Sequence, residues 1–183
     1  MILEVMLSLA NQRYTSEVYA RRFLNIGPDS SIVGWAENMV IAGFHSPHLD
    51  ILLGELEPFN KFEMDALLDR IQRELKLPSI RSKSEALEII ATAYGRRFIA
   101  GKADSASTLF YLSELCIAER YANEIYDFYL LHFAAVDLAI DEIQYYWPDA
   151  NRTNIEEIIR HEFISWLQNH PLTEWKKFEW DNA

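Results

Sequence analysis

Signals that start and stop helices recur along this chain of 183 residues, and strand signals are nearly absent. Ser46 followed by Pro47 is typical of a helix N-cap with proline in the first turn, and Gly54 stands where that helix would end. Asn60 with Glu63 three residues later resembles a capping box. These local signals predict an all-α fold.

Apolar residues at helical spacing mark nine stretches, and from them we expect a fold of about eight helices. Such stretches cover residues 2–11, 16–24, 31–42, 47–53, 61–76, 82–101, 104–117, 122–146 and 155–169. The stretch 122–146 is apolar around most of its circumference, so we expect it to be the central, buried helix of a multi-helix bundle. The length suits a single domain over 1–183, with residues 77–84 as the one plausible boundary between layers.

Charge is divided unevenly between the two halves. The net charge is −11, and residues 103–183 carry 5 Lys/Arg against 15 Asp/Glu together with 15 of the 24 aromatic residues. No Lys or Arg lies between Tyr121 and Ala150. Such a surface repels nucleic acid and membrane phosphates and attracts a basic protein, so we expect a basic protein partner and neither of the other two.

The remaining composition favours a cytoplasmic protein. Cys116 is the only cysteine, which rules out a disulfide within the chain. The apolar first ten residues lack the basic start and the small-residue cleavage site of a signal peptide. The longest apolar region is interrupted by His132 and Asp137, so no membrane span is expected.

One acidic and aromatic constellation is the candidate binding surface. Placed at 100° per residue, five acids fall within an arc of about 140° that also holds Leu130, Leu131, Ala134 and Leu138. The acids are Glu124, Asp127, Asp137, Asp141 and Glu142, and the aromatic anchors that follow are Tyr145, Tyr146 and Trp147. Exposed leucines flanked by acids would resemble a protein interface. Alternatively, the leucines are buried and the acids line a solvated edge.

An enzymatic role is the alternative to binding. His45, His48 and Asp50 lie within six residues, but the spacing is weak for a metal, and we expect neither a metal nor a cofactor. A helical wheel places Glu162 inside an apolar stripe, where a carboxylate needs an ion-pair partner or acts as a general acid with His132 or His161. The sequence contains no catalytic motif, which agrees better with a binding role. The binding protein we expect is a module of the immunity or antitoxin type that covers a basic partner.

Two segments together carry a family resemblance. The first is 34–62, with Trp35, Met39, Gly43, Ser46, Pro47, Leu49, Leu52 and Pro58. The second is Tyr146-Trp147-Pro148-Asp149-Ala150-Asn151-Arg152, with Asn154, Ile155 and Ile159. These segments resemble a family of small, all-helical bacterial proteins of unassigned function, and the resemblance implies a helical fold and a bacterial origin. It implies no activity.

Overall fold

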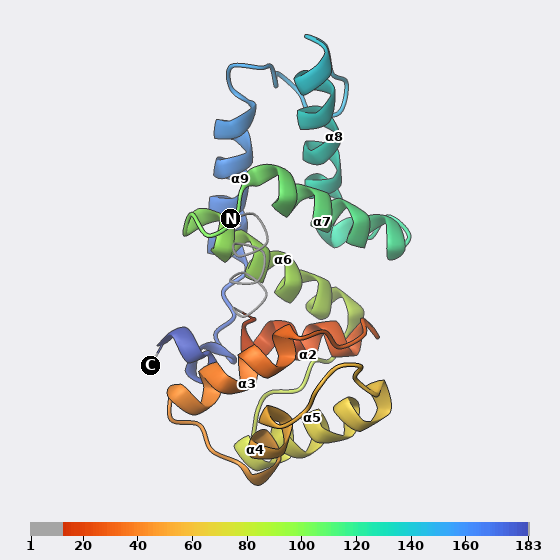
Figure 1. Ribbon diagram of the computed structural model, residues 1–183. Helices are drawn as coiled ribbons and strands as arrows, with labels where there is room; N and C mark the ends of the chain where they lie inside the picture. Colours follow the sequence, from red (N-terminus) through yellow and green to blue (C-terminus); the bar gives the residue numbers. More distant parts are fainter. Residues whose placement is uncertain (1–12, 183) are drawn as a thin grey trace. The chain divides into compact units, whose positions relative to one another are not determined.

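All regular elements in residues 13–182, which the computed structural model describes, are helical (Figure 1). This range holds eight α-helices and three short 3-10 helices, which confirms the predicted all-α class. The helix expected over 2–11 lies outside the described residues. Contacts divide the described residues into two compact units: unit 1 comprises residues 13–90 and 172–182, and unit 2 comprises residues 91–171. The division falls within a helix, and the single domain with a layer boundary near 77–84 stays a prediction.

Unit 1 combines the early helices with the C-terminal segment. Its elements are α2 (Thr15–Phe23), α3 (Ser31–Ile41), α4 (Pro47–Leu53), α5 (Lys61–Leu75), the first part of α6 (Lys83–Ile99), η2 (Lys176–Phe178) and η3 (Trp180–Asn182). The predicted caps are confirmed: Ser46 Oγ accepts from the Leu49 N–H (3.1 Å), and Asn60 Oδ1 accepts from the Phe62 N–H (3.0 Å). Local capping therefore sets where α4 and α5 begin.

The start of α2 is capped from the other end of the chain. The carboxylate of Glu179, which is 2% exposed, accepts from the Thr15 N–H (2.6 Å) and from the Ser16 hydroxyl (2.5 Å). The indole N–H of Trp180 donates to the carbonyl of Arg13 at 2.6 Å. An anion at a helix N-terminus satisfies N–H groups that have no partner inside the helix. The C-terminal segment is therefore held against α2.

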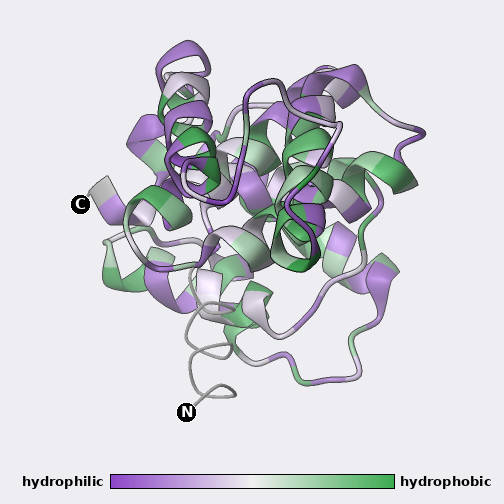
Figure 2. Ribbon diagram, turned by 90° about the horizontal axis from the view of Figure 1, so that it is seen from above, coloured by the Kyte–Doolittle hydropathy of each residue, from purple (hydrophilic) through white to green (hydrophobic). Residues whose placement is uncertain are grey.

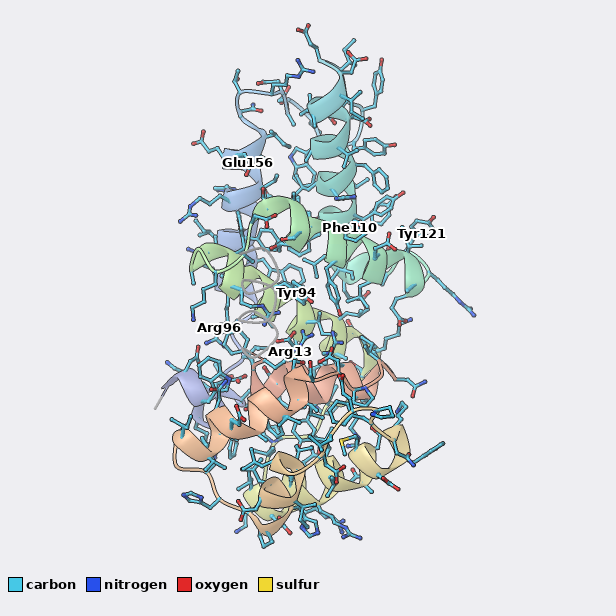
Figure 3. All side chains as sticks on the ribbon, in the orientation of Figure 1. Arg13, Tyr94, Arg96, Phe110, Tyr121 and Glu156 are labelled. Atoms are coloured by element: carbon cyan, nitrogen blue, oxygen red, sulfur yellow. The ribbon has the colours of Figure 1, made fainter. Side chains whose placement is uncertain are left out.

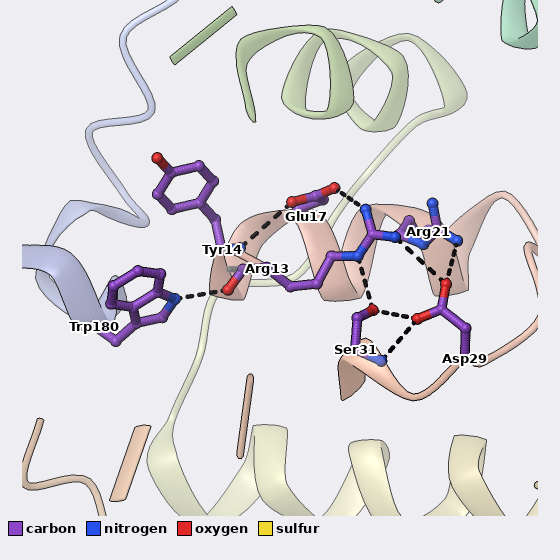
Figure 4. A network of polar contacts seen from close by, with 7 residues as sticks. All are labelled: Arg13, Tyr14, Glu17, Arg21, Asp29, Ser31 and Trp180. Atoms are coloured by element: carbon purple, nitrogen blue, oxygen red, sulfur yellow. Dashed lines mark hydrogen bonds and ion pairs between the residues drawn. The ribbon is translucent and has the colours of Figure 1, made fainter. Parts of the chain in front are cut away.

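A polar network joins α2 to α3 (Figure 4). The Arg13 guanidinium donates to Glu17 (2.5 Å) and to Ser31 Oγ (2.8 Å), and Arg21 lies 3.2 Å from Asp29. Asp29 also accepts from the hydroxyl and the N–H of Ser31. Partial burial raises the pKa of Asp29, but the Ser31 hydrogen bonds and the two arginines outweigh it and hold that pKa below its ordinary value.

Unit 2 is built on three helices around aromatic residues. Besides the end of α6 it contains α7 (Ser105–Ala118), η1 (Asn123–Ile125), α8 (Tyr126–Ile140) and α9 (Ile155–Asn169). Asp104 caps α7 by accepting from the Ser107 N–H at 2.7 Å. Helix α8 packs against α7 and α9, and the buried ring of Phe163 stacks on Phe128 at 4.5 Å. Hydrophobic and hydrophilic residues are interleaved along the ribbons, as amphipathic helices require (Figure 2).

The predicted end of the long helix at 146 is wrong, because α8 ends at Ile140. Asp141 is extended, and the loop after it is organised by the amide of Gln144, which donates to the Trp147 and Ala150 carbonyls (2.6 and 3.1 Å). Arg152 Nε donates to the carbonyl of Leu138 in the last turn (2.7 Å). The predicted start at 122 is a 3-10 turn. These longer-range hydrogen bonds override the helical pattern of residues 141–146.

Candidate functional site

Helix α8 is apolar on two opposite faces, and only one of them is buried. Phe128, Leu131, Ala134 and Leu138 are in the core. At 100° per residue, the opposite side carries Tyr126, Tyr129, Phe133, Val136 and Ile140. Ile140 is 81% exposed, and Tyr126 and Val136 are also exposed. The expectation that this helix is largely buried is therefore wrong, because α7 and α9 cover one face of it.

Aromatic rings contact one another in sequence along this exposed face. Tyr126 stacks on Tyr129 with centroids 5.3 Å apart, and Tyr129 lies 4.9 Å from Phe133. Phe133 in turn lies 5.6 Å from Tyr146, and Tyr121 meets Tyr129 edge-on at 5.5 Å. We call this surface the α8 stripe. It comprises Tyr121, Tyr126, Tyr129, Phe133, Val136, Ile140 and Tyr146.

The side of the stripe next to α7 adds Phe110 and His132. Their rings lie 5.8 Å apart, and His132 is 5.1 Å from Phe133. Phe110 and Tyr121 are both exposed and are labelled in Figure 3. Partial burial lowers the pKa of His132, and Glu114 opposes this only in part. His132 is therefore neutral at pH 7 and places no positive charge beside the stripe.

The hydroxyl of Tyr129, in the middle of the stripe, is also uncharged. Partial burial raises the pKa of Tyr129, and the neighbouring Tyr121, Tyr126 and Tyr146 add to that rise. An unionised tyrosine offers an aromatic face together with a hydroxyl that both donates and accepts. Such groups are typical anchors of protein interfaces.

The surroundings of the stripe are acidic. The segment between Tyr121 and Ala150 holds six Asp or Glu and no Lys or Arg. Of the predicted acids, Asp127 is exposed, and Glu124 and Asp137 are half-buried. Asp141 and Glu142 are exposed in the loop beyond α8, so the predicted common helical arc does not include them. The predicted acids are therefore close to the stripe in sequence, but Asp141 and Glu142 lie in the loop and not on helix α8.

The leucines of the predicted arc are not an exposed surface. Leu131 and Leu138 are buried, which agrees with the alternative that the sequence left open. The predicted anchors also differ from one another. Tyr146 belongs to the stripe, and Tyr145 is 90% exposed. Trp147 is half-buried, and its backbone N–H donates to Gln144 Oε1 (2.8 Å).

Sequence reasoning missed most of the stripe. Tyr126, Tyr129, Phe133, Val136 and Ile140 follow one another at spacings of three and four residues, which is the signal of an apolar helix face. That signal was present in the sequence, but a helix that is apolar all round does not reveal which face its neighbours cover. Tyr121 joins the stripe through its contact with Tyr129, and Phe110 lies beside the stripe through its contact with His132.

The predicted metal candidates are not brought together. His48 Nδ1 lies 2.5 Å from Glu74 Oε1, and its Nε2 lies 3.1 Å from the Arg70 guanidinium, so both ring nitrogens already have side-chain partners. His45 and Asp50 are exposed. Within residues 13–182, no group of three His, Cys, Asp or Glu side chains could hold a metal ion. His48 instead connects α4 to α5.

The candidate acid Glu162 is not enclosed in an apolar stripe. Its side chain is 34% exposed and lies 3.6 Å from Nδ1 of its neighbour His161, beyond ordinary hydrogen-bond distance. The expectation of a buried carboxylate is therefore wrong, since Glu162 lies toward the edge of its helix face. This geometry gives the enzymatic alternative no support.

Comparison of the sequence with protein-family models, with curated proteins and with solved structures found no match. The family resemblance of residues 34–62 and 146–159 therefore stays an expectation. None of the helices in residues 13–182 has the length and hydrophobicity needed to cross a bilayer.

Proposed function

We propose that the chain is a protein-binding module whose α8 stripe docks a basic, amphipathic segment of another protein. The observation that carries this proposal is the second apolar face of α8, which the rest of unit 2 leaves in contact with solvent. Exposed apolar patches of this kind mark sites of association. A cytoplasmic role of the immunity or antitoxin type, in which the stripe blocks the cationic surface of a toxin, is the specific form of the proposal.

The chemistry of the stripe defines the occupant. Tyrosine rings and two exposed aliphatic side chains, Val136 and Ile140, suit the apolar side of a helix or hairpin. The acids around them suit Lys and Arg at the edges of that segment, and tyrosine faces also attract such cations. An acidic partner, nucleic acid or an anionic membrane would be repelled by residues 121–150, a segment that holds six Asp or Glu and no Lys or Arg.

The two components of the surface have different kinetic roles. Exposed charges steer encounter and act mainly on the association rate, in a manner that salt screens. Desolvated apolar anchors act mainly on the dissociation rate. We therefore expect Asp137 and Asp141 to affect association, and Ile140 to affect the lifetime of the complex.

The test uses a matched pair of exposed isoleucines at the ends of two helices. Ile140 ends α8 and is 81% exposed, and Ile41 ends α3 and is 83% exposed. A photo-crosslinking amino acid at either position is irradiated in cells, and the attached protein is identified. We expect a basic protein attached at position 140 and none at position 41.

The affinity and the binding rates are then measured with the purified chain and the protein that crosslinking identified. Ile140→Glu should weaken binding at least about tenfold, whereas Ile41→Glu should leave it unchanged. Asp137→Lys with Asp141→Lys should slow association and reduce its dependence on salt. An acidic attached protein, attachment at position 41 alone, or binding indifferent to Ile140→Glu would reject the proposal.

A further inference from the structure

Residues 91–171 contain two stacked pairs of tyrosines, which differ in whether a cation lies on them. In the first pair, Tyr94 stacks on Tyr111 with ring centroids 4.1 Å apart and an interplanar angle of 8°. The guanidinium of Arg97, which is 4% exposed, lies 4.5 Å from the centre of the Tyr94 ring. Arginine is the side chain that most often stacks on aromatic rings, because its flat guanidinium is weakly hydrated. The protein therefore contains one complete stack of arginine on tyrosine.

The second pair belongs to the α8 stripe and is also nearly parallel. Tyr126 and Tyr129 stack with centroids 5.3 Å apart at an angle of 16°. Within residues 13–182, no Lys or Arg lies over either ring. Arg120 is the nearest cation in sequence, but it is exposed and contacts neither ring in the described part of the chain. Because Tyr126 is exposed, this pair can receive a cation from another molecule.

Tyr121 adds a third ring at right angles to the second pair. Its ring meets Tyr129 edge-on, with centroids 5.5 Å apart and an interplanar angle of 89°. Tyr121 is 53% exposed and has φ at 59°, in the left-handed region that a bulky residue rarely adopts. Its N–H donates to the Cys116 carbonyl at 2.7 Å, which holds this conformation at the end of α7. The backbone thus fixes the ring against Tyr129 before any partner binds.

Polar groups at the edges of these rings suit the N–H groups of a guanidinium. Partial burial raises the pKa of Tyr129, and three nearby hydroxyls add to that rise. They are those of Tyr121, Tyr126 and Tyr146. The four hydroxyls therefore lie close together, and each can accept a hydrogen bond. Asp127 follows Tyr126 in sequence and is exposed, so a carboxylate is also near.

We infer that the tyrosine cluster, which comprises Tyr121, Tyr126 and Tyr129, receives an arginine side chain of the protein that docks on the α8 stripe. This inference rests on the proposed function and specifies one contact of the partner. A guanidinium can stack on a tyrosine face, as one does on the first pair, while its five in-plane N–H groups donate to the surrounding hydroxyls. Residues 121–150 hold six Asp or Glu and no Lys or Arg, so the surrounding charge favours a cation. A lysine ammonium is compact and strongly hydrated, and it would stack less well.

The experiment compares helical peptides of leucine and alanine that carry arginine, lysine or citrulline at the same positions. Citrulline has nearly the shape of arginine without its charge, so the comparison separates charge from planar stacking. Fluorescence anisotropy of the labelled peptides measures their affinity for the full chain. We expect the arginine peptide to bind about fivefold more tightly than the lysine peptide, and the citrulline peptide to bind at least about tenfold more weakly than the arginine peptide.

Substitutions of single tyrosines then locate the bound arginine. Tyr121→Leu and Tyr126→Leu should each weaken binding of the arginine peptide about fivefold and remove its advantage over the lysine peptide. Leucine keeps an apolar side chain, so a purely apolar role of these rings would leave that advantage unchanged. Tyr145→Leu is the matched control, because Tyr145 is 90% exposed and contacts none of the three rings within residues 13–182. Both cationic peptides should bind to this control as they bind to the wild type.

The outcomes separate this inference from the proposed function. Equal affinity of the arginine and lysine peptides for the wild type would overturn the inference and leave the proposed function standing, since both peptides are basic. Absence of binding by either cationic peptide would contradict both. A preference for arginine that persists in Tyr121→Leu and Tyr126→Leu, or that is lost in Tyr145→Leu, would reject the tyrosine cluster as the site.

Discussion

Removal of the Glu179 carboxylate should destabilise the protein more than removal of any exposed acid. Glu179 is 2% exposed and accepts hydrogen bonds from the Thr15 N–H (2.6 Å), the Ser16 hydroxyl (2.5 Å) and the Ser16 N–H (3.3 Å). Alanine at this position would leave all three buried donors without this acceptor. The cap of α2 and the attachment of the C-terminal segment would be lost together.

The magnitude follows from the number of contacts. A hydrogen bond to a charged group contributes about 1.5–3 kcal/mol, and loss of an N-cap costs about 0.5–2 kcal/mol. The two contributions cannot simply be added, because the same carboxylate makes the hydrogen bonds and caps the helix. We therefore expect Glu179→Ala to lower the free energy of unfolding by about 3 kcal/mol. In a chain of this length that corresponds to a fall in melting temperature of about 6–12 °C.

Thermal and guanidinium unfolding, followed by circular dichroism, measure this change. Glu174→Ala is the matched control on the same segment, because its exposed side chain should contribute less than about 0.5 kcal/mol. A double-mutant cycle of Glu179→Ala with Ser16→Ala should show a coupling of about 1–2 kcal/mol. Equal effects of Glu179→Ala and Glu174→Ala, or no coupling to Ser16, would show that Glu179 does not cap α2.

Three further predictions concern unit 2. Gly95→Ala should lower stability by about 2 kcal/mol in thermal unfolding, since the new Cβ would lie 2.9 Å from Phe163; Gly27→Ala, which meets nothing within 4 Å, should change it little. Burial lowers the pKa of His132 in the folded protein. The stability that depends on its neutral form is therefore fully present above the pKa of His132 in the unfolded chain, about 6.5, and is lost as the pH falls below that value. The free energy of unfolding of the His132→Phe variant should therefore change less between about pH 7 and pH 5 than that of the wild type. Burial raises the pKa of Cys116, so the thiol should react with a disulfide reagent only after denaturation, and rapid reaction of the native protein would contradict its buried position.

Much of the helical framework could be predicted because its signals are local. The helix over 155–169 was predicted with the observed bounds, and Ser46 and Asn60 cap the helices that they were expected to cap. A cap acts on N–H groups two or three residues away, so the sequence contains both the donor and the acceptor. The start of α2 is different, because its cap is Glu179, 164 residues beyond Thr15. No local pattern could have indicated it.

The sequence by itself determined that an apolar helix lies within residues 122–146, in an acidic segment. Only the tertiary structure decided that Leu131 and Leu138 face the core while Tyr129 and Ile140 do not, because α7 and α9 cover one face and the sequence is apolar on both. The end of that helix was likewise decided by Arg152, which binds the carbonyl of Leu138 from fourteen residues away. Periodicity and capping act over a few residues, whereas the choice of buried face depends on which surfaces meet when the chain folds.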